Sequence, residues 1–385
     1  SEMCIRDRFE VMLHLADQGV DVLRLDAAPF MWKREGTICQ NLPEVHLLLT
    51  TLRSLMSVAA PATAFKAEAI VAPEELPPYL GAGEPERHEC DLAYNNQLMV
   101  LLWSSLATGD AALMTNALRR LGAIPSTAAW VNYVRCHDDI GWAITEADAA
   151  SVGWSSLSHR DFLLQFYAGQ FPGSFAKGAV FQYNPETGDG RTSGSAASLC
   201  GIERALADHD DVHLELACAR LELLYAVTYA YGGIPLLYMG DELGLCNDTT
   251  YLGDAAKADD NRWLHRPRMD WALAERRHQP GTLQARLFAM FAALGAARAG
   301  IGALDASGRV VVQVSPDPHL LCFTRSHPVH GSFVMLANFG RGTAVVRLAD
   351  VGAGGAAVQR SVGAVVTVDG VAQLSANGYL WLTAS

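Results

Sequence analysis

The chain has 385 residues, half of them hydrophobic, which is enough for a large core and a second domain. Its formal net charge of -12 argues against nucleic acid or an acidic membrane surface as a partner, and no run of eighteen apolar residues predicts a membrane helix. The eight cysteines are scattered without a C-x-x-C pair, which predicts neither a zinc site nor a disulfide framework. Reduced thiols favour a cytoplasmic location, with secretion left open.

The first residues do not fit the rest of the chain. Residues 1–8 show no apolar pattern, and the chain begins with Ser rather than Met. We therefore expect residues 1–8 to be a non-native artefact and the chain to be an N-terminally truncated fragment.

Strand and helix patterns alternate over the first third of the chain, which predicts a parallel α/β sheet. The expected elements, in chain order, are helix 9–18, strand 20–28, helix 41–59, strand 62–71, strand 91–94, helix 96–106, helix 111–121 and strand 130–136. Residues 77–89 form a Pro-, Gly- and Glu-rich loop. The side chains expected on the buried side of helix 41–59 are Leu47, Leu48, Leu52, Leu55 and Met56.

The alternation breaks at residues 144–210, which are rich in Gly, Ser and aromatics and predict a lid or substrate loop. The elements expected after this insertion are helix 213–231, strand 234–239, a charged loop 254–268 and helix 282–299. Short alternating strands with Gly turns then predict a separate antiparallel β-sandwich domain over 303–385. Residues 9–302 would form the α/β domain.

The strand at 20–28 carries a charged pair. Because side chains alternate along a strand, Val22, Arg24 and Asp26 share one face. An Arg and an Asp on a buried face are costly unless they pair or act in chemistry. An Asp beside a guanidinium should stay ionised, as a nucleophile requires, although a structural ion pair explains this stretch equally well.

Three predicted strands end in carboxylates, Asp26, Glu68 and Asp138. Their spacing fits about one and then two strand–helix units of a TIM barrel, which places catalysis at the carboxyl ends of its strands. The carboxylates would then meet in one site. Two carboxyl groups acting as nucleophile and acid/base make up the retaining glycosidase arrangement.

Several segments together resemble the α-amylase superfamily, glycoside hydrolase family 13, and within it the amylosucrases and sucrose hydrolases. These segments are GVDVLRLDAAPFMWK (19–33), FKAEAIV (65–71), WVNYVRCHDDIGW (130–142), NPETGDGRTSG (184–194), GGIPLLYMGDELGLCND (232–248) and DDNRWLHRPRMDW (259–271). The resemblance implies a (β/α)8 TIM barrel, of which this chain holds only the C-terminal five strand–helix units. The first motif, the B domain and the upstream strands of the family are absent here, so we expect the fragment alone to be inactive.

The resemblance also implies roles for the catalytic residues. Asp26 matches the nucleophile that takes the glucosyl unit, and Glu68 matches the general acid/base. Asp138 matches the carboxylate that grips sugar hydroxyls and stabilises the transition state. The matched substrate-binding residues are Arg24, His137, Asp139, Arg191 and Arg262. No cofactor and no metal are implied.

Each assignment has a structural alternative. Glu68 could be the buried partner of Lys66, and His137 could be a satisfied core histidine. Arg191 and Arg262 lie in polar runs that are usually solvated. The acidic pair Asp241 and Glu242 after strand 234–239 is given a structural role at the barrel rim.

The implied function is retaining α-glucosyl transfer from sucrose to an α-1,4-glucan or maltooligosaccharide acceptor, with release of fructose. A sucrose hydrolase or another α-glucosidase of the family is the alternative, and a non-catalytic sugar-binding barrel is a remote one. Other family members, such as sucrose phosphorylase and trehalose synthase, are intermediate alternatives. Acceptor choice depends on the lid and on water exclusion, and the long 144–210 insertion with Arg191 favours transfer.

Overall fold

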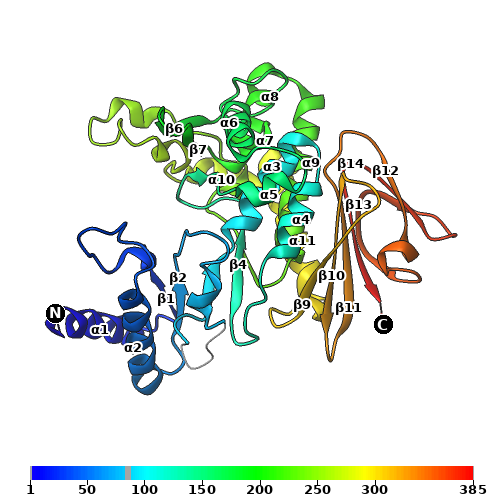
Figure 1. The fold of residues 1–385 in the computed structure, drawn as a ribbon. Helices are drawn as coiled ribbons and strands as arrows, with labels where there is room; N and C mark the ends of the chain where they lie inside the picture. Colours follow the sequence, from blue (N-terminus) through cyan, green and yellow to red (C-terminus); the bar gives the residue numbers. More distant parts are fainter. Residues whose placement is uncertain (1, 83–87, 385) are drawn as a thin grey trace. The chain divides into compact units, whose positions relative to one another are not determined.

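The computed structural model describes residues 2–82 and 88–384 (Figure 1). Its contacts divide the chain into two units, one of residues 1–96 and 121–131 and one of residues 97–120 and 132–385. Part of the loop expected at 77–89 lies outside the described residues. Among the described residues, no helix has the length and apolar character needed to span a membrane.

The first unit is built on a parallel sheet. Its strands follow the order β1 (Val22–Leu25), β2 (Ala64–Ala67), β3 (Leu92–Tyr94) and β4 (Ala129–Tyr133). The register places Arg24 opposite Lys66, and the last two residues of β4 and all of β8 (Ile234–Leu236) belong to the second unit. The parallel strands confirm the predicted alternation, but each is shorter than its apolar run suggested.

Helix α2 (Pro43–Ala59) covers the sheet of the first unit with a narrower apolar stripe than predicted. Leu48, Leu52 and Met56 are buried at helical spacing against β1 and β2. Leu47 is 66% exposed, so its placement on the buried side was wrong, and so was that of Leu55. Both lie about a quarter turn away from the stripe, where the helix faces solvent.

Helix α1 (Glu2–Asp17) begins seven residues before the expected start at Phe9. Ile5, Phe9 and Met12 are spaced at i, i+4 and i+7 and pack against the same core as α2. The apolar pattern therefore continues into residues that had seemed to carry none, with Ile5 as its first member.

The second unit holds the helices α3 (Asn96–Thr108), from Gln97 on, and α4 (Ala112–Arg120). The region 144–210, which was predicted to be a lid or substrate loop, contains a set of short elements. They follow β5 (Ile140–Gly141) and are, in chain order, α5 (Glu146–Ala150), α6 (Ser156–Tyr167), β6 (Ala179–Asn184), β7 (Asp189–Ser193), α7 (Ala196–Cys200) and α8 (Ile202–Asp208). The strands form a small antiparallel sheet in the order β5-β7-β6.

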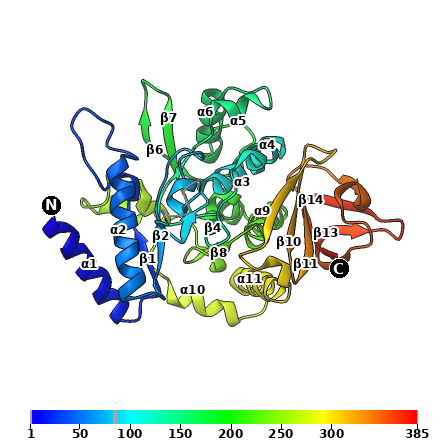
Figure 2. The same cartoon turned by 60° about the horizontal axis from the view of Figure 1, so that its bottom comes forward.

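Three further helices follow in the second unit: α9 (Asp211–Ala230), α10 (Trp271–Glu275) and α11 (Leu283–Ala299). Helix α9 contacts α11 and also β14 (Val371–Ala384) of the C-terminal sheet (Figure 2). Glu222 of α9 accepts hydrogen bonds from Arg360 (2.8 Å) and from the Tyr379 hydroxyl (2.9 Å). Helix α9 thus packs against another helix and against the C-terminal sheet.

The C-terminal strands form one curled antiparallel sheet. These strands are β9 (Arg309–Gln313), β10 (Leu320–His327), β11 (Gly331–Asn338), β12 (Ala344–Arg347), β13 (Ala357–Val366) and β14. Strand β14 pairs with β13 along one edge, and with β12 and then β11 along the other. The sheet confirms the antiparallel domain, whereas a sandwich of two sheets is not confirmed.

Asn338 fixes the turn between β11 and β12 from inside the sheet. Its fully buried amide nitrogen donates to the carbonyls of Gly342 (2.8 Å), Leu374 (3.0 Å) and Ser375 (2.9 Å), and its oxygen accepts from the Gly340 N–H (2.8 Å). We expect N338A to lower the free energy of unfolding by about 3 kcal/mol, because buried backbone groups lose their partners. Urea denaturation measures this, and N116A, which removes a partly exposed amide, should change it by less than about 0.5 kcal/mol. Equal effects would contradict the assignment.

Candidate active site

Arg24 holds two carboxyl groups in the first unit. Its Nη1 lies 2.6 Å from Oδ1 of Asp26, and its Nη2 lies 2.5 Å from Oε1 of Glu68. The planar guanidinium fork suits this double contact because its donors diverge in a fixed geometry. The side chain of Asp26 is 73% exposed, so the prediction that it lies on a buried face was wrong. Strand β1 is the first strand in the sheet order.

The environment of Glu68 favours its protonated form. Burial raises the pKa of Glu68, and a hydrogen bond to the carboxyl group of Asp26 raises it further. The Ala27 N–H, 3.0 Å from Oε2, and the charge of Arg24 only partly offset this rise. Two carboxyl groups that share a hydrogen bond need a proton between them, and Glu68 is the group whose pKa is raised. Glu68 is therefore the member of the pair whose environment favours the protonated form.

Lys66 does not pair with Glu68. Its ammonium group lies 4.6 Å from the centroid of the Tyr94 ring, in a cation–π contact on the neighbouring strand. Glu68 instead takes its positive partner from Arg24 on β1. The alternative of a simple buried Lys66–Glu68 pair is thereby excluded.

Asp138 belongs to the second unit and is held by arginines from the charged run after β8. Nη1 of Arg262 lies 3.2 Å from Oδ1 of Asp138, and Nη2 of Arg266 lies 3.8 Å from the same atom. Burial alone would raise the pKa of Asp138, but the hydrogen bond and charge of Arg262 hold it below its ordinary value. Arg262 is itself fixed by Asp260, with Nε 2.8 Å from Oδ1. It is therefore not a solvated surface cation.

Asp139 and Arg191 meet through the small sheet of the second unit. Strand β5 pairs with β7 so that Gly141 lies opposite Arg191, which brings the Arg191 Nη1 within 3.2 Å of Asp139 Oδ2. Burial raises the pKa of Asp139, more than the charge of Arg191 lowers it. The other oxygen, Oδ1, is buried without a hydrogen-bond partner. A buried carboxyl oxygen without a partner is suited to a hydrogen bond with a hydroxyl group of a ligand.

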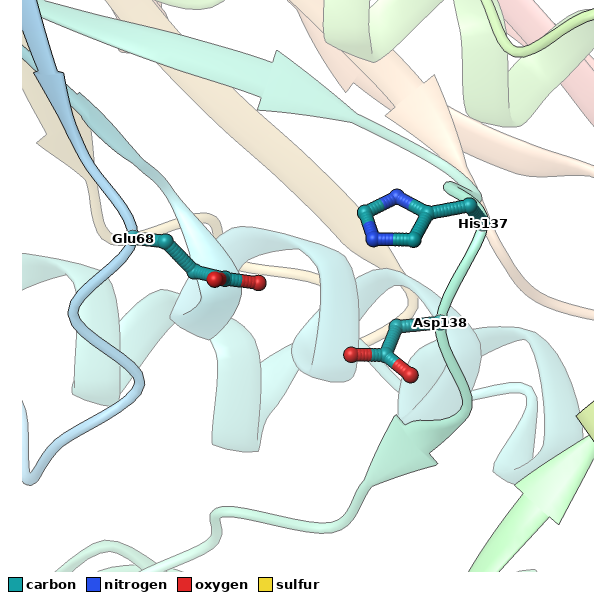
Figure 3. Close-up of side chains that lie close together, drawn as sticks. All are labelled: Glu68, His137 and Asp138. Atoms are coloured by element: carbon teal, nitrogen blue, oxygen red, sulfur yellow. The ribbon is translucent and has the colours of Figure 1, made fainter. Parts of the chain in front are cut away.

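Figure 3 shows Glu68 on the segment that follows β2, and His137 and Asp138 on the segment that follows β4. His137 is partly exposed, as a fully buried core histidine would not be. Within either unit taken alone, the described residues hold no cluster of three His, Cys, Asp or Glu side chains close enough to share a metal ion. Sequence reasoning missed Arg266, although its place four residues after Arg262 offered a signal.

No family model matches the chain. In sequence, the chain is 32% identical over 247 residues to a trehalose synthase of Thermus thermophilus, covering 64% of this chain and 21% of that protein. It is 28% identical over 257 residues to a glucosylglycerate phosphorylase of Escherichia coli, covering 67% of this chain and 42% of that protein. The matched region thus spans less than half the length of these curated relatives.

In structure, the chain is similar to sucrose 6F-phosphate phosphorylase from Thermoanaerobacter thermosaccharolyticum, with a TM-score of 0.63 and 16% identity over 88% of this chain and 59% of that one. The structural neighbours are TIM-barrel enzymes. The relatives and neighbours agree with the predicted resemblance to the α-amylase superfamily, glycoside hydrolase family 13, and the structural likeness at 16% identity shows the fold. Within it, the sequence relatives are trehalose synthases and glucosylglycerate phosphorylases, and the predicted amylosucrase or sucrose hydrolase subgroup is not confirmed.

The opposite pKa shifts of Glu68 and Asp138 predict opposite effects of pH on stability. Because its folded-state pKa is raised, Glu68 stabilises the fold most at low pH, and this contribution is lost as pH rises through the folded pKa. Because its folded-state pKa is lowered, Asp138 contributes stability at neutral pH that is lost as pH falls through the folded pKa.

We therefore expect the stability of E68Q relative to wild type to increase as pH rises from about 4 to about 8. The stability of D138N relative to wild type should decrease as pH rises from about 2 to about 5. Urea denaturation at a series of pH values measures both trends, and each variant serves as the control for the other. Parallel trends in the two variants would contradict the assigned shifts.

Proposed function

We propose that this chain carries the catalytic carboxylates of a retaining enzyme that transfers an α-glucosyl unit from sucrose to an α-1,4-glucan or maltooligosaccharide acceptor and releases fructose. The observation that carries the proposal is the hydrogen-bonded Asp26–Glu68 pair on the Arg24 fork. The raised pKa of Glu68 supports the acid role for Glu68 and leaves the nucleophile role to Asp26, which is how neighbouring carboxyl groups divide the two roles.

Each group then has a defined step. The ionised carboxylate of Asp26 attacks the anomeric carbon of the glucosyl unit, while Glu68 gives its proton to the departing fructosyl oxygen. This leaves a glucosyl ester on Asp26 and an ionised Glu68. Glu68 next removes a proton from the acceptor hydroxyl, whose oxygen attacks the anomeric carbon and releases Asp26.

The pair must open when substrate binds. Retaining enzymes keep the two carboxyl groups about 5–5.5 Å apart, whereas Asp26 and Glu68 are in hydrogen-bond contact here. A glucosyl ring that enters between them would replace the shared hydrogen bond with contacts to the anomeric carbon and the glycosidic oxygen. Arg24 can retain its contact with Asp26 during this change, because each carboxyl group uses a different nitrogen of the guanidinium group.

We assign the remaining sequence-predicted residues to the same sugar. Asp138 is kept ionised by Arg262 and would accept hydrogen bonds from sugar hydroxyls as positive charge develops on the ring. His137 would donate to a neighbouring hydroxyl group. Asp139 and Arg191 would contact the acceptor or the fructosyl unit through the free oxygen of Asp139. In this proposal, residues 9–302 form the catalytic domain, 144–210 its lid and 303–385 a C-terminal domain.

The sequence relatives favour a second candidate. The proteins that this chain matches include one named for trehalose synthesis and one named for phosphorolysis of glucosylglycerate. The same two carboxyl groups would serve these reactions, because only the glucosyl donor and the acceptor differ. Trehalose and phosphate therefore belong in any test of substrate.

Substitution of the carboxyl groups tests the assigned steps. In the longest reading frame that contains this chain, we expect D26N to lower kcat on an α-glucoside by roughly 10⁴–10⁶-fold. E68Q should lower kcat by roughly 10²–10⁴-fold on sucrose. It should lower kcat much less on α-glucosyl fluoride, whose leaving group needs no proton. Steady-state kinetics measure the losses in both variants. The control is E186Q, because Glu186 is exposed in the turn between β6 and β7. Equal losses for E68Q on the two substrates would contradict the acid role.

Product analysis tests the reaction. The same protein is incubated with sucrose alone, with trehalose alone and with each donor plus inorganic phosphate, and the sugars are quantified. We expect fructose in excess over free glucose, together with α-glucan, from sucrose. Equal glucose and fructose would establish hydrolysis, and glucose 1-phosphate would establish phosphorolysis. Conversion of trehalose without cleavage of sucrose would reject the proposed donor in favour of the second candidate.

A further inference from the structure

The segment that carries His137 and Asp138 is tied by its backbone as well as by its side chains. The carbonyl of Asp138 accepts a hydrogen bond from Nη2 of Arg135 at 2.8 Å, and its N–H lies 3.4 Å from Sγ of Cys136. The carbonyl of His137 accepts from Nε of Arg266 at 2.5 Å and faces Nε2 of His265 at 3.2 Å. These contacts come from within the second unit.

The same two side chains, Arg135 and His265, also hold Gly194, which directly follows β7. Nε of Arg135 donates to the Gly194 carbonyl at 2.9 Å, and the Gly194 N–H donates to Nδ1 of His265 at 3.3 Å. Both side chains are 1% exposed, so neither contact competes with water. Gly194 lies three residues after Arg191, on the segment that leads from β7 into α7.

The ring of His265 is neutral and has one defined tautomer. Burial and the charges of Arg135 and Arg266 lower the pKa of His265 to about 2. Because Nδ1 accepts a hydrogen bond from the Gly194 N–H, the single ring proton must lie on Nε2, where it donates to the His137 carbonyl. The imidazole therefore acts as a fixed two-ended connector between the two backbone segments.

We propose that His265 and Arg135 are positioning residues, which together clamp the His137–Asp138 backbone to Gly194 and so set the orientation of the Asp138 carboxylate and the spacing to Arg191. This inference rests on the proposed function for its catalytic consequence, since Asp138 would act on the sugar. The clamp itself rests only on the contacts above. Neither residue would touch the substrate.

The clamp adds restraints on the position of the Asp138 carboxylate that Arg262 alone does not provide. The guanidinium of Arg262 restrains only one carboxylate oxygen of Asp138, from a partly exposed side chain. A carboxylate that must meet a charged transition state loses much of its effect when it is misplaced by about 1 Å, with about 10²-fold loss of rate. The hydrogen bonds to the carbonyls on both sides of the Asp138 Cα restrain the backbone and so limit movement of this carboxylate.

Substitution of His265 separates the two ends of the connector. Gln can replace Nε2 as a donor to the His137 carbonyl, Asn can replace Nδ1 as an acceptor, and Leu can do neither. We expect H265L to lower kcat by roughly 10- to 100-fold with KM changed by less than about threefold. H265Q should retain more kcat than H265N, because its donor reaches the segment that carries Asp138. R135K keeps the charge but cannot reach both carbonyls, and should resemble H265L.

The matched control is H159L. His159 of α6 is also a buried neutral histidine, 7% exposed, with its pKa lowered to about 4 by burial and with Nε2 2.8 Å from Oγ of Ser104. H159L should lower the melting temperature as much as H265L does and reduce kcat much less than H265L does, because its partner Ser104 lies on α3 and not beside Asp138. If H265L and H159L reduce kcat equally, or if H265L leaves kcat unchanged, the positioning role is rejected.

A readout without substrate keeps this inference separate from the proposed function. Hydrogen–deuterium exchange should show faster exchange of residues 136–139 and of the Gly194 amide in H265L, with H265Q intermediate over 136–139 and H159L like wild type. Unchanged exchange in H265L would overturn the clamp, whatever the enzyme does. Faster exchange without any effect of D26N or E68Q on activity would overturn the proposed function and leave the clamp in place.

Discussion

The contact on which the candidate site depends is the fork of Arg24 between Asp26 and Glu68. The parallel register of β1 and β2 sets Leu25 opposite Ala67, so the residues that follow, Asp26 and Glu68, leave the sheet at the same level. The Glu68 N–H donates to the Leu25 carbonyl at 3.0 Å, and the Ala28 N–H donates to the Glu68 carbonyl at 3.1 Å, which continues the pairing past the last strand residues. A Lys in place of Arg24 would offer a single point charge and could not hold both carboxyl groups in divergent directions.

This part of the site could be predicted from the sequence because it depends on short-range rules. Side-chain alternation placed Arg24 and Asp26 on one face, and the structure brings them into contact. Alternation also placed Lys66 on the face of Glu68, but it could not predict the partner. The long stem of Lys66 carries the ammonium group to the ring of Tyr94 on the next strand, and this leaves Glu68 to Arg24.

The region 144–210 could not be predicted in the same way, because all of its helices except α6 are too short for periodicity to be recognised. Helices α5 and α7 have five residues each, and each starts at a Thr or Ser whose side chain accepts the hydrogen bond of an N–H three residues later. The curl of the C-terminal sheet was missed for a related reason. It depends on the register shifts of β13 between Val358 and Arg360 and between Val362 and Ala364, which alternation alone does not reveal.

The two halves of the proposed reaction also differ in this way: one depends on short-range sequence patterns and the other on the pairing of distant segments. The acid and the nucleophile lie at the ends of two adjacent strands and share one arginine, so a local motif is sufficient to place them. The residues proposed for the acceptor, Asp139 and Arg191, lie 52 positions apart and meet only because β5 pairs with β7. Cleavage chemistry can therefore be read from short motifs, whereas acceptor choice depends on how the 144–210 region folds. This is the physical reason why the acceptor is the part of the proposal that product analysis must decide.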